Sequence, residues 1–199
     1  VVGNMFLDNV VSNKKNKDEQ TILFITRPHK SIKCYSPSRN HLEGVEILKT
    51  ILEFMAINND TKLIIKPHPM DNYLLYEECI FGSGMEARIK ITNENLQNIF
   101  PKVNLIVTED STAGAESMFY KLPCIHAHLA KTEPVLPLVK YGSALPGNTK
   151  DKLKESLISS FKLSKKEYEK MKKGQEYFIK DFLPLGNLTD LVNFIMKNI

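Results

Sequence analysis

Residues 63–69 read Leu-Ile-Ile-Lys-Pro-His-Pro, which places an apolar run directly before a rigid polar turn. The apolar run predicts a buried strand, and Pro67 and Pro69 end it because proline cannot donate to a strand ladder. A second apolar run, Val103–Thr108, leads into residues 109–116, Glu-Asp-Ser-Thr-Ala-Gly-Ala-Glu, which predict a tight turn and a helix start. The N–H groups at a helix start favour an anion such as phosphate. Two such strand ends predict a ligand-binding edge of an α/β sheet.

Apolar runs alternate with amphipathic segments along the whole chain. Strands are predicted at residues 21–26, 62–66, 87–91, 103–108 and 123–127, and helices at residues 42–57, 70–82, 93–100 and 112–120. Residues 128–149 are predicted to be mostly loop, and four helical segments follow, separated at Ser164, Gly174 and residues 183–186. This alternation predicts a doubly wound, Rossmann-like parallel sheet with helices on both faces and a helical C-terminal extension.

The composition is that of an ordinary globular protein. The chain has 199 residues, 42% hydrophobic and 25% charged, which predicts a single α/β domain spanning residues 1–199. The chain begins without Met, so we expect a fragment, a processed product or one half of a longer protein. No apolar run reaches 18 residues and no signal-peptide pattern is visible. The cysteines, Cys34, Cys79 and Cys124, are scattered, which indicates reduced thiols and a cytoplasmic setting.

The formal net charge of +4 is mild. Much of the excess lies in residues 150–173, where Lys alternates with Glu as on a solvated helix face. Aromatic residues are not interleaved with these lysines, so a nucleic-acid partner is not expected. Attraction to an anionic membrane surface stays open as an alternative.

Polar residues follow three of the predicted strands. Right-handed crossovers bring the carboxyl ends of parallel strands to one edge, so these residues are expected to meet in one crevice. They are Arg27 and His29, Lys66 and His68, and Asp110, Ser111 and Thr112.

The flanking prolines hold the backbone of His68 rigid, which favours a functional role over a structural one. A histidine there could donate to a phosphate and, if protonated, offset the charge of a departing diphosphate. Lys66 could pair with phosphate as a point charge or simply face solvent. Arg27 and His29 could contact phosphate or a second substrate, with an exposed turn as the alternative.

The turn after the fourth strand offers several contacts to a nucleotide. The hydroxyls of Ser111 and Thr112 could reach a phosphate, and Gly114 lets a ligand approach the backbone closely. Glu116 lies one turn further and could accept hydrogen bonds from ribose hydroxyls. The alternative is that Asp110 or Ser111 only caps the helix.

Three further residues carry weaker signals. Glu133 could hold a sugar hydroxyl from the loop after the fifth strand. His126 and His128 have an i, i+2 spacing, but no carboxylate or cysteine pattern accompanies them, so no metal site is predicted. Glycine patterns of Rossmann dinucleotide sites, P-loops and α/β-hydrolases are also absent.

The order of these motifs resembles the C-terminal half of a GT-B enzyme, over nearly the whole chain. The opening Gly3-Asn4 and Asp8 are similar to the segment that begins that half, and the layout is similar to UDP-N-acetylglucosamine 2-epimerases. Residues 66–69, Lys-Pro-His-Pro, resemble bacterial capsule and teichoic-acid transferases: polysialyltransferases, Kdo transferases and CDP-glycerol glycerophosphotransferases.

The resemblance implies roles for particular residues. Donor-nucleotide binding would fall on His68, Pro69, Ser111 and Thr112, with ribose binding on Glu116. The epimerases carry His-Arg-Arg-Glu where residues 27–30 here read Arg-Pro-His-Lys, and Ser-Gly-Gly where Ser-Thr-Ala-Gly stands here. Both departures argue against epimerisation.

The resulting expectation is the donor-nucleotide-binding domain of a bacterial-type glycosyltransferase in cell-surface polysaccharide synthesis, with His68 as its catalytic residue. The substrate would be a UDP-, CDP- or CMP-activated donor, with no separate cofactor. The resemblance implies an N-terminal acceptor half as partner, with residues 188–199 crossing to it. The cysteines indicate a cytoplasmic location, at the inner membrane face if the basic surface attracts lipid. Alternatives are an epimerase-like enzyme and a non-catalytic nucleotide-binding or interaction module.

Overall fold

The computed structural model describes residues 20–27 and 42–182. Five sequence-based expectations lie outside these residues: those on His29, on Cys34, on residues 3–8, on the helix break at residues 183–186 and on residues 188–199.

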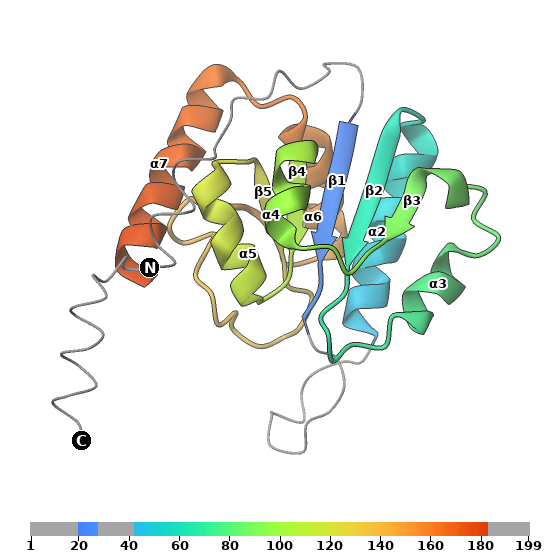
Figure 1. Cartoon of the computed structure of the whole chain (residues 1–199). Helices are drawn as coiled ribbons and strands as arrows, with labels where there is room; N and C mark the ends of the chain where they lie inside the picture. The colour runs from blue at the N-terminus through green and yellow to red at the C-terminus, as the bar shows by residue number, and fades with distance from the viewer. Residues whose placement is uncertain (1–19, 28–41, 183–199) are drawn as a thin grey trace, which may run out of the picture.

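One parallel sheet organises the described part of the chain, and its strand order is β3-β2-β1-β4-β5-β6 (Figure 1). The strands are β1 (Gln20–Ile25), β2 (Thr61–Lys66), β3 (Ile89–Ile91), β4 (Leu105–Thr108), β5 (Cys124–Ala127) and β6 (Leu145–Gly147). The chain winds outward from β1 to β3, returns to β4 on the other side of β1, and winds outward again. The predicted doubly wound α/β fold is confirmed.

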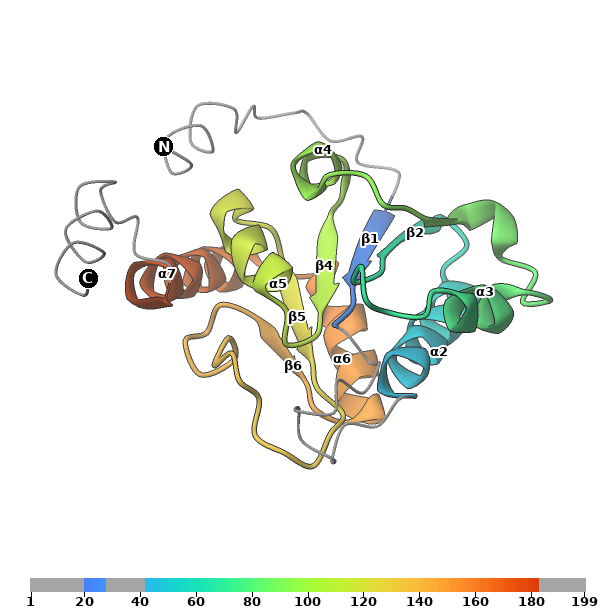
Figure 2. The same cartoon turned by 60° about the horizontal axis from the view of Figure 1, so that its bottom comes forward.

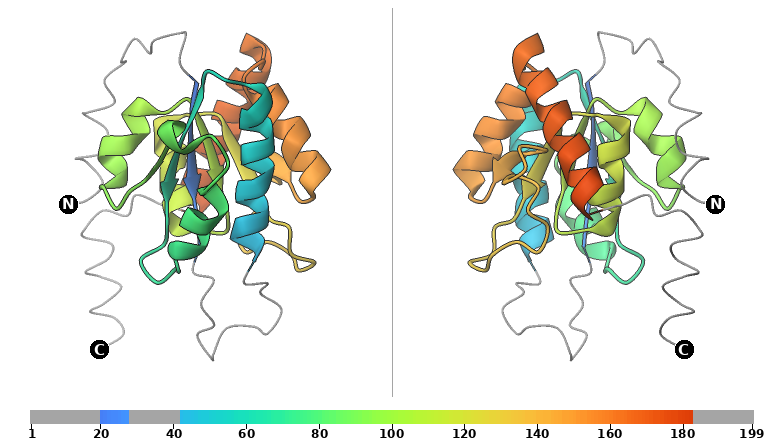
Figure 3. Two further views of the ribbon diagram at one scale, coloured as in Figure 1. Left: turned by 90° about the vertical axis from the view of Figure 1, so that its right-hand side faces the viewer. Right: turned by 90° about the vertical axis from the view of Figure 1, so that its left-hand side faces the viewer.

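Helices cover both faces of this sheet (Figure 3). The α-helices are α2 (Glu43–Ile57), α3 (Leu74–Ile80), α4 (Leu96–Ile99), α5 (Thr112–Glu116), α6 (Lys150–Ser160) and α7 (Lys165–Phe182). Short 3-10 turns η1 (Glu86–Arg88), η2 (Phe100–Lys102) and η3 (Ser117–Tyr120) supplement them. One buried cluster joins the sheet to α2, α3 and α6, and a second joins it to α4, α5 and α7.

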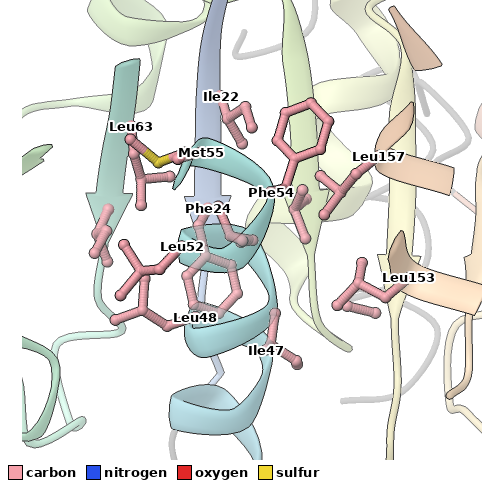
Figure 4. Close-up of a cluster of buried hydrophobic side chains, with 14 of the residues drawn as sticks. Ile22, Phe24, Ile47, Leu48, Leu52, Phe54, Met55, Leu63, Leu153 and Leu157 are labelled. Carbon is pink, nitrogen blue, oxygen red and sulfur yellow. The ribbon is translucent and has the colours of Figure 1, made fainter. Parts of the chain in front are cut away.

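The side chains of β1 alternate between these two clusters, as a strand buried on both faces requires. Ile22 and Phe24 pack into the first cluster, shown in Figure 4, and Leu23 and Ile25 pack into the second. All four are at most 2% exposed, which explains why β1 reads as a continuous apolar run rather than an alternating one.

The sheet register brings four strand ends level with one another. Ile25 pairs with Lys66 on one side and with Thr108 on the other, and Thr108 pairs in turn with His126. Figure 2 views this carboxyl edge, with β1 and β4 side by side at the point where the winding direction reverses. A doubly wound sheet binds ligands outside such a reversal point.

The structure adds one short strand to the predicted elements. Residues 128–149 are mostly loop, as expected, but β6 (Leu145–Gly147) lies within them. Its Leu-Pro-Gly sequence lacks the usual strand residues, and the structure tolerates Pro146 because β6 is the edge strand.

The helix α7 also runs without interruption through Gly174, where a break was expected. The glycine is needed for packing instead of helix termination. A Cβ at position 174 would lie 2.5 Å from the carbonyl atoms of Gly142 and 2.5 Å from the carbonyl oxygen of Tyr141. The missing side chain therefore lets α7 approach the backbone of the β5–β6 connection.

The substitution Gly174→Ala tests this packing. At an unhindered helix position the change would stabilise the protein by roughly 1 kcal/mol. Here we expect the free energy of unfolding to fall by about 1–3 kcal/mol, because backbone atoms must move to admit the methyl group. Urea denaturation measures it, with the exposed Lys173→Ala as the matched control on the same helix; a more stable Gly174→Ala protein would contradict the account.

Candidate functional site

A buried charge cluster lies under the carboxyl edge of the sheet, with Arg27 at its centre. This residue directly follows β1 and Thr26, and it is 3% exposed. Its guanidinium forms an ion pair with Glu43, and it lies 3.6 Å from Glu109 and 3.9 Å from Asp110. The exposed-turn alternative for Arg27 is therefore wrong. Arg27 acts as an internal counter-ion to three carboxylates, and its predicted phosphate contact stays a prediction.

Glu43 connects the cluster to two more segments. It opens the first turn of α2, where the helix dipole favours a carboxylate. Its Oε1 accepts hydrogen bonds from the backbone N–H groups of Leu129, at 2.7 Å, and Ala130, at 3.0 Å. The loop after β5 is thereby fixed to the start of α2.

Asp110 joins the ends of β4 and β5. His126 Nε2 lies 3.1 Å from its Oδ1, and His128 Nδ1 lies 3.1 Å from its Oδ2. Its oxygens also accept the backbone N–H groups of Val135, at 3.2 Å, and Leu136, at 3.0 Å. Burial alone would raise the pKa of Asp110, but the hydrogen bond with His126, the ion-pair contact with His128 and the hydrogen bond from Leu136 hold that pKa well below its usual range. The N-cap of α5 is Ser111, so the alternative that Asp110 caps this helix is wrong.

A second network fixes the turn that follows β2. The Thr26 hydroxyl accepts the backbone N–H of His68 at 2.9 Å and donates to Asp71 Oδ2 at 2.9 Å. The Tyr76 hydroxyl donates to the same Asp71 oxygen at 2.6 Å. These bonds join the β2 turn to the end of β1, so the predicted approach of His68 to the Arg27 segment is present.

The protonation of His68 follows from one further contact. The backbone N–H of Met70 donates to His68 Nδ1 at 3.1 Å, so Nδ1 is an acceptor and Nε2 carries the proton. Burial lowers the pKa of His68, which Asp71 opposes and Lys66 reinforces. The neutral imidazole with a donor at Nε2 is the favoured form. The half-buried side chain of Lys66 stands close by, and Pro69 is exposed next to it.

The turn after β4 presents Ser111 and Thr112 at the same edge. Ser111 is 8% exposed and makes no capping hydrogen bond with its side chain, while Thr112 is exposed as the first residue of α5. Glu116, also exposed, ends α5, and partial burial of its carboxyl raises its pKa.

Gly114 has a packing role, and its expected role in ligand approach stays a prediction. A Cβ there would lie 2.1 Å from Thr108 Oγ1, so the glycine is required for α5 to pack against the end of β4. Ligand access to the backbone is not needed to explain it.

An open pocket of about 540 Å³ flanks the buried charge cluster on the α2 and α6 side. Its lining comes from the start of α2, the loop after β5 and the start of α6: Leu42, Glu43, Glu46, Leu129, Ala130, Asn148, Thr149 and Lys150. Of the predicted site residues within the described part of the chain, none lines this pocket.

Glu133 lies exposed in the loop after β5, two residues before the backbone N–H that Asp110 holds. In residues 20–27 and 42–182, no group of three or more His, Cys, Asp or Glu side chains is arranged to hold a metal ion. None of the helices in these ranges has the length and apolar character required to cross a membrane.

Sequence reasoning missed Glu43 and Glu109 and did not connect His126 and His128 with Asp110. The helix pattern held a signal for Glu43, because it precedes Ile47 by four residues on the buried face of α2. A charged residue in an apolar stripe indicates a buried partner.

No protein-family model matches the chain, and no curated protein matches it. Solved structures do match. A UDP-GlcNAc 2-epimerase from Methanocaldococcus jannaschii, in complex with UDP-GlcNAc and UDP, has 21% sequence identity and a TM-score of 0.56, and the match covers 92% of this chain and 52% of that one. The C-terminal domain of the group 1 glycosyl transferase LpcC from Francisella tularensis has 10% identity and a TM-score of 0.56, with 84% and 87% covered.

A third match is WaaG, a glycosyltransferase involved in lipopolysaccharide biosynthesis, with 12% identity, a TM-score of 0.56, and 83% of this chain and 44% of that chain covered. These identities are low, so the matches establish a shared fold. The chain spans about half the length of the epimerase structures that it matches.

Replacing the guanidinium tests the importance of the buried charge cluster. Arg27→Met should lower the free energy of unfolding by about 3–5 kcal/mol at neutral pH, because it leaves buried carboxylates without their counter-ion. The matched control is Lys49→Met, which removes an ion pair with Glu46 at the surface and should cost at most about 1 kcal/mol. Chemical denaturation measures both, and equal losses would show that the cluster contributes no more than a surface pair.

Proposed function

We propose that this domain binds the nucleotide of an activated sugar or polyol phosphate donor. The enzyme would be a bacterial-type glycosyltransferase acting in cell-surface polysaccharide synthesis. One observation carries the proposal: the two polar turns, at His68 and at Ser111, follow β2 and β4, the two neighbours of β1 at the point where the winding of the sheet reverses. The fold is shared with glycosyltransferases and with an epimerase bound to UDP.

His68 would contact the phosphate through its Nε2–H. Met70 holds Nδ1 as an acceptor, and Thr26 fixes the backbone, so the donor is oriented before the ligand arrives. A preoriented donor stabilises the charge that develops on a leaving phosphate. The lowered pKa makes the neutral ring the starting form, so the role would not require a permanently charged imidazole.

Ser111 and Thr112 would supply further donors from the other side of the reversal point. The Ser111 side chain makes no capping bond, so its hydroxyl could turn toward a phosphate oxygen. Glu116 and Glu133 would accept hydrogen bonds from ribose and sugar hydroxyls. Lys66 would add positive charge beside His68.

The catalytic event would be displacement of the nucleoside diphosphate, or of the monophosphate for a CMP-activated donor. The residues named above stabilise the leaving group, so an acceptor-binding half and a general base would complete the site. We propose that a separate N-terminal half supplies them, and that the enzyme works in the cytoplasm at the inner membrane face.

A 2-epimerase is the second candidate, because the match to the epimerase from Methanocaldococcus jannaschii covers 92% of this chain. Product analysis of an enzyme containing this domain, with UDP-N-acetylglucosamine as substrate, separates the two. A free epimerised sugar favours the epimerase, and sugar transferred to an acceptor favours the transferase.

Isothermal titration of the chain with UDP, CDP and CMP tests the proposed site directly. We expect at least one of them to bind, with affinity falling as salt rises because the contacts are to phosphate. Failure of all three to bind would contradict the nucleotide site and favour an interaction module.

Two substitutions of His68 separate its two nitrogens. Asn can replace the Nδ1 acceptor but has no atom near Nε2, whereas Gln can place a donor near Nε2. We expect His68→Asn to weaken nucleotide binding by about tenfold to a hundredfold, the effect of a lost hydrogen bond to a charged group. His68→Gln should retain most of the affinity. Equal affinity of wild type and His68→Asn in the same titration would argue that the motif is structural.

A further inference from the structure

Side chains outside the loop that carries Glu133 hold this loop in place. Its backbone N–H groups at Val135 and Leu136 donate to Asp110, which lies at the end of β4. Its Thr132 carbonyl faces His128, which follows β5. The position of Glu133 at the carboxyl edge therefore depends on buried side chains of two different strands.

His128 faces an acceptor with each of its ring nitrogens. Its Nε2 forms a hydrogen-bond contact of 2.6 Å with the Thr132 carbonyl oxygen. Its Nδ1 lies 3.1 Å from Asp110 Oδ2, at ion-pair distance but outside hydrogen-bond geometry. A carbonyl oxygen and an ionised carboxylate can each accept a hydrogen bond but cannot donate one. A neutral ring with its proton on Nε2 would leave a lone pair on Nδ1 only 3.1 Å from the Asp110 carboxylate, so the imidazolium is the form that these contacts favour.

The surroundings favour that positive charge. The ion pair with Asp110 raises the pKa of His128 against the opposing effect of burial, and the Thr132 carbonyl and the Glu43 carboxylate add to the increase. The other titratable groups nearby are His126, whose ring centroid is 6.2 Å away, and Arg27, 3.9 Å from Asp110. Three carboxylates gather around Arg27, so a second cation in this cluster reduces an excess of negative charge.

We propose that His128 is a positioning residue: as a buried imidazolium bridging Asp110 and the Thr132 carbonyl, it clamps the loop of residues 132–136 and with it Glu133, to which the proposed function assigns a sugar hydroxyl. The consequence for a ligand rests on the proposed function. The clamp itself does not, and it can be measured without a nucleotide.

The clamp depends on pH in a defined direction. A group whose pKa is raised on folding stabilises the folded form fully below its unfolded pKa, about 6.5 for histidine. This contribution is lost as the pH rises through the higher pKa of the folded protein. The loop is therefore clamped under mildly acidic conditions and loosens as the pH rises through the midpoint of His128 in the folded protein.

Nitrogen-15 NMR of the His128 ring tests the protonation in the wild-type chain. We expect both nitrogens to show imidazolium shifts at pH 6.5, with a midpoint above that value. A neutral ring at that pH, with one protonated and one bare nitrogen, would overturn the proposal. This measurement needs no variant, so a substitution that fails to fold does not leave the idea untested.

Amide hydrogen exchange of Val135 and Leu136 tests the clamp. His128→Asn can keep a donor toward Asp110 but loses Thr132, whereas His128→Gln can keep a donor toward Thr132 but loses Asp110. Neither titrates. We expect protection factors in wild type to fall about tenfold to a hundredfold as the pH rises through the midpoint, and to be lower and independent of pH in both variants. The exposed Lys131→Ala is the control from the neighbouring position and should behave as wild type.

Nucleotide titration of the same proteins separates the two proposals. If the wild type binds nucleotide and His128→Gln binds about tenfold more weakly, the clamp positions the site. Wild-type protection in both variants overturns the clamp whatever the nucleotide result. A clamp measured in a wild-type chain that binds no UDP, CDP or CMP overturns only the nucleotide site and its link to Glu133.

Discussion

The ion pairing of Arg27 with three carboxylates is the constraint on which this edge of the protein depends. Removing charges from water is costly, and only mutual pairing and hydrogen bonds offset the cost. Glu43 brings the start of α2, Glu109 and Asp110 bring the end of β4, and Arg27 comes directly after β1. Each partner needs the others in place, so the segments that leave the sheet are fixed relative to one another before any ligand arrives.

The residues of the proposed site are connected to this cluster by hydrogen bonds and by the chain. Arg27 also donates its backbone N–H to Glu109 at 3.1 Å, while its neighbour Thr26 holds the His68 turn. Ser111 directly follows Asp110, so the buried contacts of Asp110 also fix the start of α5. The buried cluster thus supplies rigidity, and the residues at the rim are left to supply contacts. A site built to stabilise a developing phosphate charge requires such preorganisation.

The sequence was sufficient to predict the fold, because the spacing of apolar residues and the order of the segments along the chain indicate a fold class. The apolar run of β1 and the amphipathic pattern of α2 predict a parallel sheet with helices on both faces, and the structure confirms it. The helix break predicted at Gly174 is wrong, because the sequence does not distinguish a glycine that ends a helix from one that lets another backbone pack closely. The strand β6 was missed because an edge strand needs few of the usual strand residues.

The residues that directly follow the strands could be predicted from the sequence, whereas the buried ion pairs could not. His68 and Ser111 directly follow apolar runs, so their place at the carboxyl edge could be inferred. The pairing of Arg27 with Glu43, and of Asp110 with His128, joins residues that are distant in sequence. A sequence pattern around one residue does not identify such a partner. Only a register such as the alignment of Ile25 with Thr108 brings those partners together.

The central claim is that a nucleotide binds across the β1–β4 reversal point. Backbone amide chemical shifts of the labelled chain, titrated with UDP, CDP and CMP, test it most directly. The account predicts saturable shifts concentrated at His68 and at residues 111–114. Shifts confined to the pocket between α2 and α6, or no saturable shift with any of the three nucleotides, would contradict it.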